Sequence, residues 1–125
     1  MKKILIVEDN EKNMKLARDL LQAKGYATHE ATTGVDGVRL AKEHTPDLVL
    51  MDIQLPDING IEAFEQLRAD PRTAEIPIVA FTASVTPTDR TRVMQAGFDG
   101  FLSKPINIKE FLATVKRMLQ DGGQT

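Results

Sequence analysis

Ile4-Leu5-Ile6-Val7 is an uninterrupted apolar run, and the acidic pair Glu8-Asp9 follows it directly. A second apolar run, Leu48-Val49-Leu50-Met51, ends in the same way at Asp52. Runs of this kind are typical of strands buried on both faces, as in a parallel sheet covered by helices. Because the carboxyl ends of parallel strands meet at one edge of the sheet, we expect the three carboxylates to gather there. Only a cation could hold such a cluster together, which favours a divalent-metal site.

Length and composition restrict the class of protein. The 125 residues fit one domain with a hydrophobic core and leave no room for an additional output domain. The formal net charge of -2 gives no broad cationic field, so nucleic acid is not an expected ligand. The absence of cysteine excludes disulfides and thiolate zinc sites and fits a cytoplasmic protein. After Lys2-Lys3 the apolar stretch is too short for a signal peptide, and no membrane insertion is expected.

Strand-like runs alternate with helical patterns along the chain. The runs begin near residues 4, 26, 48, 78 and 100, and the intervals between them can each hold a crossover helix. Residues 108–119 carry one apolar stripe with helical periodicity, and Thr86-Pro87-Thr88-Asp89 is typical of a helix start. The pattern predicts a doubly wound α/β fold, a flavodoxin-like three-layer sandwich with a five-stranded parallel sheet in the order 2-1-3-4-5. We expect residues 1–121 to form this domain and residues 122–125 to form a flexible tail.

Short motifs at the ends of four expected strands resemble the receiver domain of two-component response regulators. The resemblance covers residues 3 to about 120 and rests on these motifs in chain order: Glu8-Asp9, Asp52, Pro56 with Gly60, Thr82-Ala83 and Lys104-Pro105. The sequence around three of these motifs is similar to that of single-domain members of the family that act in cell division. Receivers of hybrid histidine kinases have similar sequences around these motifs.

Asp52 takes the central role that this resemblance implies. In the family this carboxylate attacks the phosphorus atom of a phosphohistidine and becomes an acyl phosphate. Taken alone, Asp52 has a simpler interpretation as a turn residue that accepts backbone amides before Pro56. The ordered set of motifs favours the phosphoacceptor.

The resemblance also implies a Mg²⁺ site, in which Mn²⁺ can substitute. Asp9 would be a direct ligand, and Asp52 and the backbone carbonyl of Gln54 would add oxygens, a set that suits magnesium. Glu8 stands where the family more commonly has aspartate, so its binding directly or through water stays open. The simpler alternative is that Asp9 or Asn10 caps the following helix. Without a cation, carboxylates about 4 Å apart repel by about 4 kcal/mol at an effective dielectric of 20, which predicts a raised proton affinity or a loosened loop.

Lys104 and Thr82 complete the catalytic set that the resemblance gives to Asp52. Lys104 would pair with one phosphoryl oxygen and the Thr82 hydroxyl with another, and the family has a cis bond between Lys104 and Pro105. Phe101 matches a switch residue that turns inward when the threonine moves. Each residue also has a simpler interpretation: Lys104 as a solvated surface lysine, Thr82 as a β-branched residue at a strand end, and Phe101 as a permanently buried core residue.

Partner surfaces follow from the same resemblance. A histidine kinase or histidine phosphotransferase would dock beside the acidic cluster, and a downstream protein would bind the face formed by residues 86–120. The expected docking residues for the phosphodonor are Asn10, Asn13, Met14, Pro105 and Ile106. The expected exposed residues on the output face are Arg90, Arg92 and Lys109.

The function predicted from the sequence is a cytoplasmic, phosphorylation-controlled switch, with a role in cell-cycle or cell-division control. It would assist its own phosphorylation and hydrolysis without turning over a separate substrate. The alternatives are a pseudo-receiver adaptor that works without phosphorylation and a receiver excised from a hybrid histidine kinase. A flavin binder is disfavoured because Glu8-Asp9-Asn10 would repel a phosphate, and an aspartate-nucleophile phosphatase because Gln54 stands where a second acid is usual.

Overall fold

The structure is a computed structural model that describes residues 1–83 and 86–122. Strands and helices alternate along this part of the chain, as the sequence predicts. The elements are β1 (Lys3–Val7), α1 (Glu11–Ala23), β2 (Ala27–Ala31), α2 (Gly34–His44), β3 (Leu48–Met51), α3 (Gly60–Ala69), β4 (Ile78–Thr82), α4 (Pro87–Ala96), β5 (Gly100–Ser103) and α5 (Ile108–Gly122).

The five strands form one parallel sheet in the order β2-β1-β3-β4-β5, which confirms the predicted fold class and strand order. β1 lies between β2 and β3, and Val7 is paired with Met51 on β3 and with Ala31 on β2. This register sets the ends of β1 and β3 side by side. The winding of the chain reverses at this pair of strands, which is where doubly wound sheets bind ligands.

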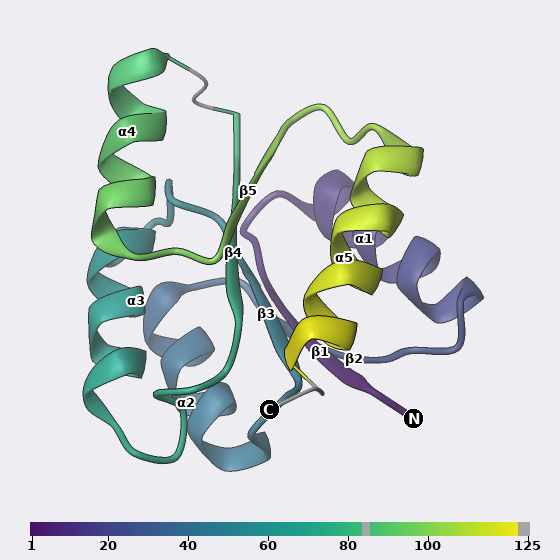
Figure 1. The fold of residues 1–125 in the computed structure, drawn as a ribbon, viewed down its shortest axis with the longest axis horizontal. Coiled ribbons are helices and arrows are strands. Elements are labelled where there is room, and N and C mark those ends of the chain that lie inside the picture. Colours follow the sequence, from purple (N-terminus) through teal and green to yellow (C-terminus); the bar gives the residue numbers. More distant parts are fainter. Residues whose placement is uncertain (84–85, 123–125) are drawn as a thin grey trace.

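Helices cover both faces of the sheet, with α1 and α5 on one side and α2, α3 and α4 on the other (Figure 1). Side chains alternate along each strand, so each face has its own core. Leu5 and Val7 belong to the core beneath α2, α3 and α4, whereas Ile4 and Ile6 belong to the core beneath α1 and α5. Most of the stripe predicted for residues 108–119 is confirmed, since Phe111, Val115 and Leu119 are buried in the second core, whereas Ile108 at its start is 52 % exposed.

β2 is the polar edge strand that its sequence predicts, because four of its five residues are not fully buried. His29 lies on this strand, and His44 lies at the end of α2. Both side chains are half-buried, and the two rings stack with centroids 4.2 Å apart and an interplanar angle of 11°.

The helix ends follow the local signals in the sequence. Asn10 caps α1 by accepting a hydrogen bond from the amide of Asn13 at 3.1 Å. Gly25 and Gly97 follow α1 and α4 with φ of 88° and 109°, a left-handed conformation that glycine adopts at helix ends. α5 extends to Gly122, one residue beyond the predicted boundary. The rest of the predicted tail, residues 123–125, lies outside the described residues.

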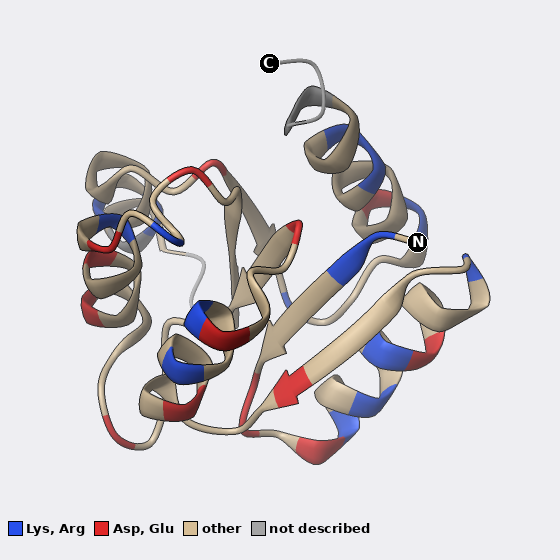
Figure 2. Cartoon of the chain, turned by 90° about the horizontal axis from the view of Figure 1, so that it is seen from below, with Lys and Arg blue, Asp and Glu red and all other residues tan. Residues whose placement is uncertain are grey.

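Acidic and basic residues both occur along the outer surfaces of the helices (Figure 2). This distribution agrees with the small net charge of -2. Among the helices of the described residues, none has the length and apolar character needed to cross a membrane.

Candidate functional site

The backbone ladder places the acidic residues at the carboxyl edge of the sheet. The amide of Asp52 donates to the carbonyl of Val7 at 3.0 Å, and the amide of Glu8 donates to the carbonyl of Ala31 at 2.9 Å. These bonds extend the parallel pairing by one residue beyond β1 and β3. Glu8 and Asp52 are therefore fixed next to each other by the sheet itself.

Lys104 follows the edge strand β5, and its side chain contacts both of these acids. Its Nζ donates to Oδ2 of Asp52 at 2.8 Å and forms an ion pair with Oε1 of Glu8. Its own amide donates to the carbonyl of Thr82 at 2.9 Å, and the Lys104-Pro105 bond is cis, as the family resemblance implies. The ammonium also lies 4.9 Å from the centroid of the Phe81 ring. Lys104 is thus held inward over the acids and is not a freely solvated surface lysine.

Glu8, Asp9 and Asp52 form the candidate metal site. One ligand oxygen from each lies within 4.8 Å of the others. Glu8 and Asp52 are buried and Asp9 is exposed, so the cluster opens to solvent on one side. The second oxygen of Glu8, Oε2, is buried and has no hydrogen-bond partner among the described residues. A buried anionic oxygen without a partner is costly, and a hard divalent cation with oxygen ligands would relieve that cost. The residues present therefore fit a magnesium ion.

The charge state of Glu8 reflects this crowding. Burial, followed by the hydrogen bond shared with Asp52, raises the pKa of Glu8 to about 7, while Lys104 acts in the opposite direction. Because the pKa rises, the neutral carboxyl of Glu8 is favoured below about pH 7 when no divalent cation is bound. The raised proton affinity that the sequence predicts for a metal-free cluster is confirmed at Glu8.

Asp52 is only 4 % exposed, and both of its oxygens are engaged. Oδ1 accepts from the amide of Gln54 at 2.9 Å, and Oδ2 accepts from Lys104. The simpler interpretation of Asp52 as a turn residue thus describes a real bond. That bond also orients the carboxylate beside the ammonium, so the two interpretations are compatible.

Close packing at Gly60 fixes the loop that follows Asp52. A Cβ atom on Gly60 would lie 2.3 Å from the carbonyl oxygen of Asp52, so a side chain there would displace the backbone of the candidate nucleophile. The amide of Gly60 donates to the carbonyl of Ile53 at 2.9 Å. Gly60 therefore sets the backbone on which Asp52 is presented.

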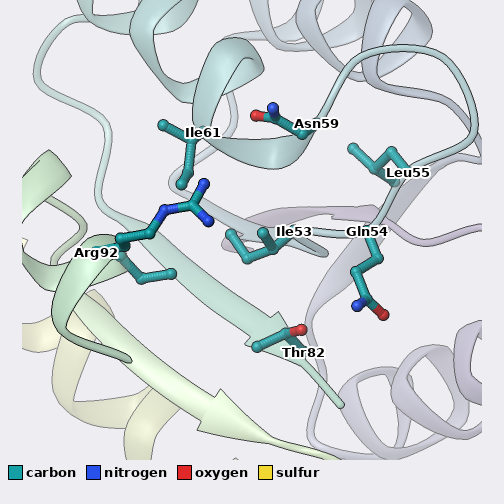
Figure 3. Close-up of a pocket in the computed structure, with 8 residues that line it drawn as sticks. Ile53, Gln54, Leu55, Asn59, Ile61, Thr82 and Arg92 are labelled. Carbon is teal, nitrogen blue, oxygen red and sulfur yellow. The ribbon is translucent and has the colours of Figure 1, made fainter. Parts of the chain in front are cut away.

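Thr82 is buried at the end of β4 and borders a cavity of about 250 Å³ between α3 and α4. Figure 3 shows the Arg92 side chain reaching across this cavity toward Ile61 and Ile53. The remaining lining residues are Gln54, Leu55, Asn59 and Val93.

Phe101 is half-buried and packs against the core beneath α2, α3 and α4. The guanidinium carbon of Arg90 lies 5.4 Å from the centroid of the Phe101 ring. Arg90, Arg92 and Lys109 are exposed, as expected.

The residues predicted to dock a phosphodonor are only partly on the surface. Asn10 and Pro105 are exposed, and Asn13 and Ile106 are half-buried. Met14 is 5 % exposed and belongs to the core beneath α1 and α5, so its prediction as a docking residue is wrong. Its position in the apolar stripe of α1 turns it toward the sheet.

Asp57 is a residue that sequence reasoning missed. It lies in the loop between β3 and α3, and its carboxylate accepts from the amides of Gly34 and Val35 at 2.8 Å and 2.9 Å. These bonds lower the pKa of Asp57, with Val35 the main cause. No local signal predicts them, because the partners lie more than 20 positions away in the sequence.

Comparison with known proteins shows the class to which this fold and site belong. Residues 4–116 match the family model of the response regulator receiver domain, so the chain is a member of the response regulator receiver family. It is 46% identical over 120 residues to the polar-differentiation response regulator DivK of Brucella ovis, and the match covers 96% of this chain and 98% of the relative. The DivK of Brucella abortus matches to the same extent.

Solved structures support the same assignment. The receiver domain of a sensor histidine kinase from Pseudomonas aeruginosa, described with a magnesium ion coordinated in its active-site cleft, is 33% identical with a TM-score of 0.89. That match covers 95% of this chain and 98% of the other. The receiver domain of a histidine kinase from Syntrophus aciditrophicus is 30% identical with a TM-score of 0.91, covering 100% and 95% of the two chains.

Proposed function

We propose that this response regulator accepts a phosphoryl group on Asp52 from the phosphohistidine of a histidine kinase or histidine phosphotransferase. In this proposal it then changes its binding to a downstream protein in the cytoplasm. Likeness to polar-differentiation regulators supports a role in cell-cycle or cell-division control. The observation that carries the proposal is the junction of Asp52, Glu8 and Lys104 at the carboxyl edge of the sheet, beside a buried Glu8 oxygen that has no partner among the described residues.

Asp52 is the nucleophile in this proposal. One carboxylate oxygen bonds to phosphorus while the phosphorus–nitrogen bond of the donor breaks, and the bonding electrons and a proton remain with the imidazole. The Lys104 ammonium already contacts Oδ2 of Asp52, so it is placed to neutralise charge on the transferred group. The Gln54 amide holds the other carboxylate oxygen and limits rotation of Asp52.

Glu8, Asp9, Asp52 and the backbone carbonyl of Gln54 are the proposed Mg²⁺ ligands, and Mn²⁺ is the expected substitute. When bound, the metal supplies positive charge to the phosphoryl oxygens. Glu8 is ionised in that state, because a divalent cation favours the charged carboxylate over the neutral acid. The chain assists its own phosphorylation and dephosphorylation and has no separate substrate in this proposal.

Thr82 and Phe101 form the proposed switch. New negative charge at Asp52 would draw the Thr82 hydroxyl toward the phosphoryl group. Phe101 packs against the core that includes Ile53 and Val93, and these two residues also line the cavity next to Thr82, so the ring would have partly apolar space close by. Movement of the ring would alter the surface that carries Arg90, because that guanidinium lies over Phe101.

The proposed docking surface for the phosphodonor consists of Asn10, Asn13, Pro105 and Ile106, which flank the acidic cluster. The proposed output surface consists of α4, β5 and α5, including Arg90, Arg92 and Lys109. Phosphorylation acts on it through differential stabilisation: a change in population from 1:99 to 99:1 needs about 5.5 kcal/mol.

Incubation with acetyl phosphate and Mg²⁺ followed by intact-mass measurement tests the assignment. We expect one phosphoryl adduct on the wild type and none on Asp52→Asn. An adduct that persists in Asp52→Asn, or no adduct on the folded wild type, would overturn it. A pull-down comparing the two forms would then identify partners that depend on phosphorylation.

A further inference from the structure

We infer that Asp57 is a positioning residue for the metal site: it fixes the backbone of the loop between β3 and α3 by binding this loop to the first turn of α2. The inference rests on the proposed function, in which the Gln54 carbonyl of this loop is a magnesium ligand. Asp57 itself is exposed and does not belong to the acidic cluster of Glu8, Asp9 and Asp52.

The loop of residues 53–59 is closed at its base. The Ile53 carbonyl accepts the Gly60 amide at 2.9 Å, and the Asp52 carboxylate accepts the Gln54 amide at 2.9 Å. Both bonds lie where the loop leaves β3 and enters α3. They determine where the loop starts and ends, and the orientation of the chain between them needs further contacts.

Asp57 supplies such contacts from the middle of the loop. Its two carboxylate oxygens accept separate amides, from Gly34 at 2.8 Å and from Val35 at 2.9 Å. Charged hydrogen bonds to the first amides of a helix are favourable, because these amides have no partner within the helix and carry partial positive charge. A two-point contact of this kind fixes orientation as well as distance.

Two observations show that the contact is more than an ordinary helix cap. α2 already has a local cap, because the Thr33 hydroxyl accepts the Asp36 amide at 3.1 Å. In addition, Gly34 leaves room for the neighbouring loop residue Ile58: a Cβ atom on Gly34 would lie 2.4 Å from Cγ1 of Ile58. The start of α2 is therefore shaped to receive the loop.

The consequence concerns metal affinity. Without the Asp57 carboxylate, the loop loses its two bonds to α2, and the backbone around Gln54 samples more conformations. Only a fraction of the molecules then has the loop conformation that binds Mg²⁺, and the apparent affinity for Mg²⁺ falls in proportion to that fraction. The carboxylates of Glu8 and Asp52 remain in place because the sheet and Lys104 hold them.

The experiment measures Mg²⁺ binding directly by titrating amide NMR signals with MgCl₂ in wild type, Asp57→Ala, Asp57→Asn and Thr33→Ala. Thr33→Ala is the matched control because it removes a cap from the same helix and leaves the Asp57 carboxylate unchanged. Thermal unfolding of each variant reports the loss of helix stability, which Asp57→Ala and Thr33→Ala should share. Hydrogen exchange of the amides in residues 53–59 reports the loop.

We expect Asp57→Ala to weaken Mg²⁺ binding about 3- to 10-fold and to speed exchange in the loop, with Asp57→Asn between it and the wild type. Thr33→Ala should keep wild-type affinity. Equal Mg²⁺ affinity in Asp57→Ala and wild type, or an equal loss in Thr33→Ala, would overturn the inference. A wild type that binds Mg²⁺ but takes no phosphoryl group would contradict the proposed function alone, and one that binds no Mg²⁺ would contradict both.

Discussion

Nζ of Lys104 lies 2.8 Å from Oδ2 of Asp52, although the two residues are 52 positions apart in the chain. The parallel sheet brings them together, since each follows a strand at the same edge. The same ammonium also pairs with Glu8, so one cation contacts two buried acids. The candidate nucleophile and its charge partner are therefore assembled before any phosphodonor or metal arrives.

Replacing Lys104 with methionine tests this arrangement. Removal of one partner from a buried ion pair costs about 3 to 5 kcal/mol, because the remaining charges are left unpaired. Loss of a positioned cation at a reacting group typically slows the reaction about 100-fold. We expect both effects, measured by urea unfolding at pH 8 and by the rate of adduct formation from acetyl phosphate. Lys109→Met, at an exposed position on α5, is the control, and an equal effect in this control would refute a special role for Lys104.

Glu8 should make the metal-free protein less stable as pH rises. Its pKa is about 7 in the folded protein and near 4.5 in the unfolded chain, so the folded state binds more protons between these values. The stabilising contribution is complete below about pH 4.5 and is lost as pH rises through 7, with a magnitude of about 3 kcal/mol at most. Urea unfolding across this range should show the decline.

Glu8→Gln provides the comparison for that pH series. Because glutamine does not titrate, the variant should lack the decline between pH 4.5 and 7. Added MgCl₂ should stabilise the wild type most at pH 8, where Glu8 is ionised. A wild type and Glu8→Gln with parallel pH profiles would show that Glu8 does not titrate as described.

Gly60→Ala should impair the site through its backbone. The added Cβ would lie 2.3 Å from the Asp52 carbonyl oxygen, so the strand end must move. We expect a loss of about 2 kcal/mol or more in unfolding free energy and slower adduct formation. Gly25→Ala is the matched control, because Gly25 has a positive φ but open space around it and lies far along the chain from the site. That control should lose about 1 kcal/mol from backbone strain and keep its phosphorylation rate. Normal phosphorylation in a destabilised Gly60→Ala would contradict this role.

His29, which stacks on His44, should titrate below its ordinary pKa. Burial lowers the pKa of His29, with further contributions from His44 and Lys3. The unfolded chain therefore binds a proton more readily than the folded chain. Stability from this group is present above pH 6.5 and falls as pH drops below that value.

NMR titration of the His29 imidazole measures this effect directly. In His44→Ala the pKa of His29 should move up toward its ordinary value, because one repelling neighbour is gone and burial decreases. Lys24→Ala, an exposed lysine without a role in the pair, is the control and should leave the titration unchanged. A His29 pKa above the ordinary value in the wild type would contradict the interpretation.

The sequence predicts more about this sheet edge than about the surfaces around it. Apolar runs that end in Glu8, Asp9 and Asp52 predict that these acids lie at the carboxyl edge of the sheet. The ends of the strands are local signals in the sequence, and the parallel topology brings these ends to the same edge. Met14 shows a limit: its place near the acidic end of β1 suggests exposure, but the rotation of α1 against the sheet buries it. The pairing of His29 with His44 depends on tertiary contact and has no local signature. Asp57 was missed for the same reason.

Chemical trapping identifies the phosphorylated residue itself. An acyl phosphate is reduced by borohydride to an alcohol, so treating the phosphorylated protein and mapping its peptides identifies the modified carboxylate. We expect a single reduced side chain, at Asp52, which requires Mg²⁺ during phosphorylation and disappears in Asp52→Asn. Reduction at Asp9 or Glu8, or a phosphoryl group that resists borohydride because it lies on a hydroxyl or imidazole, would contradict it.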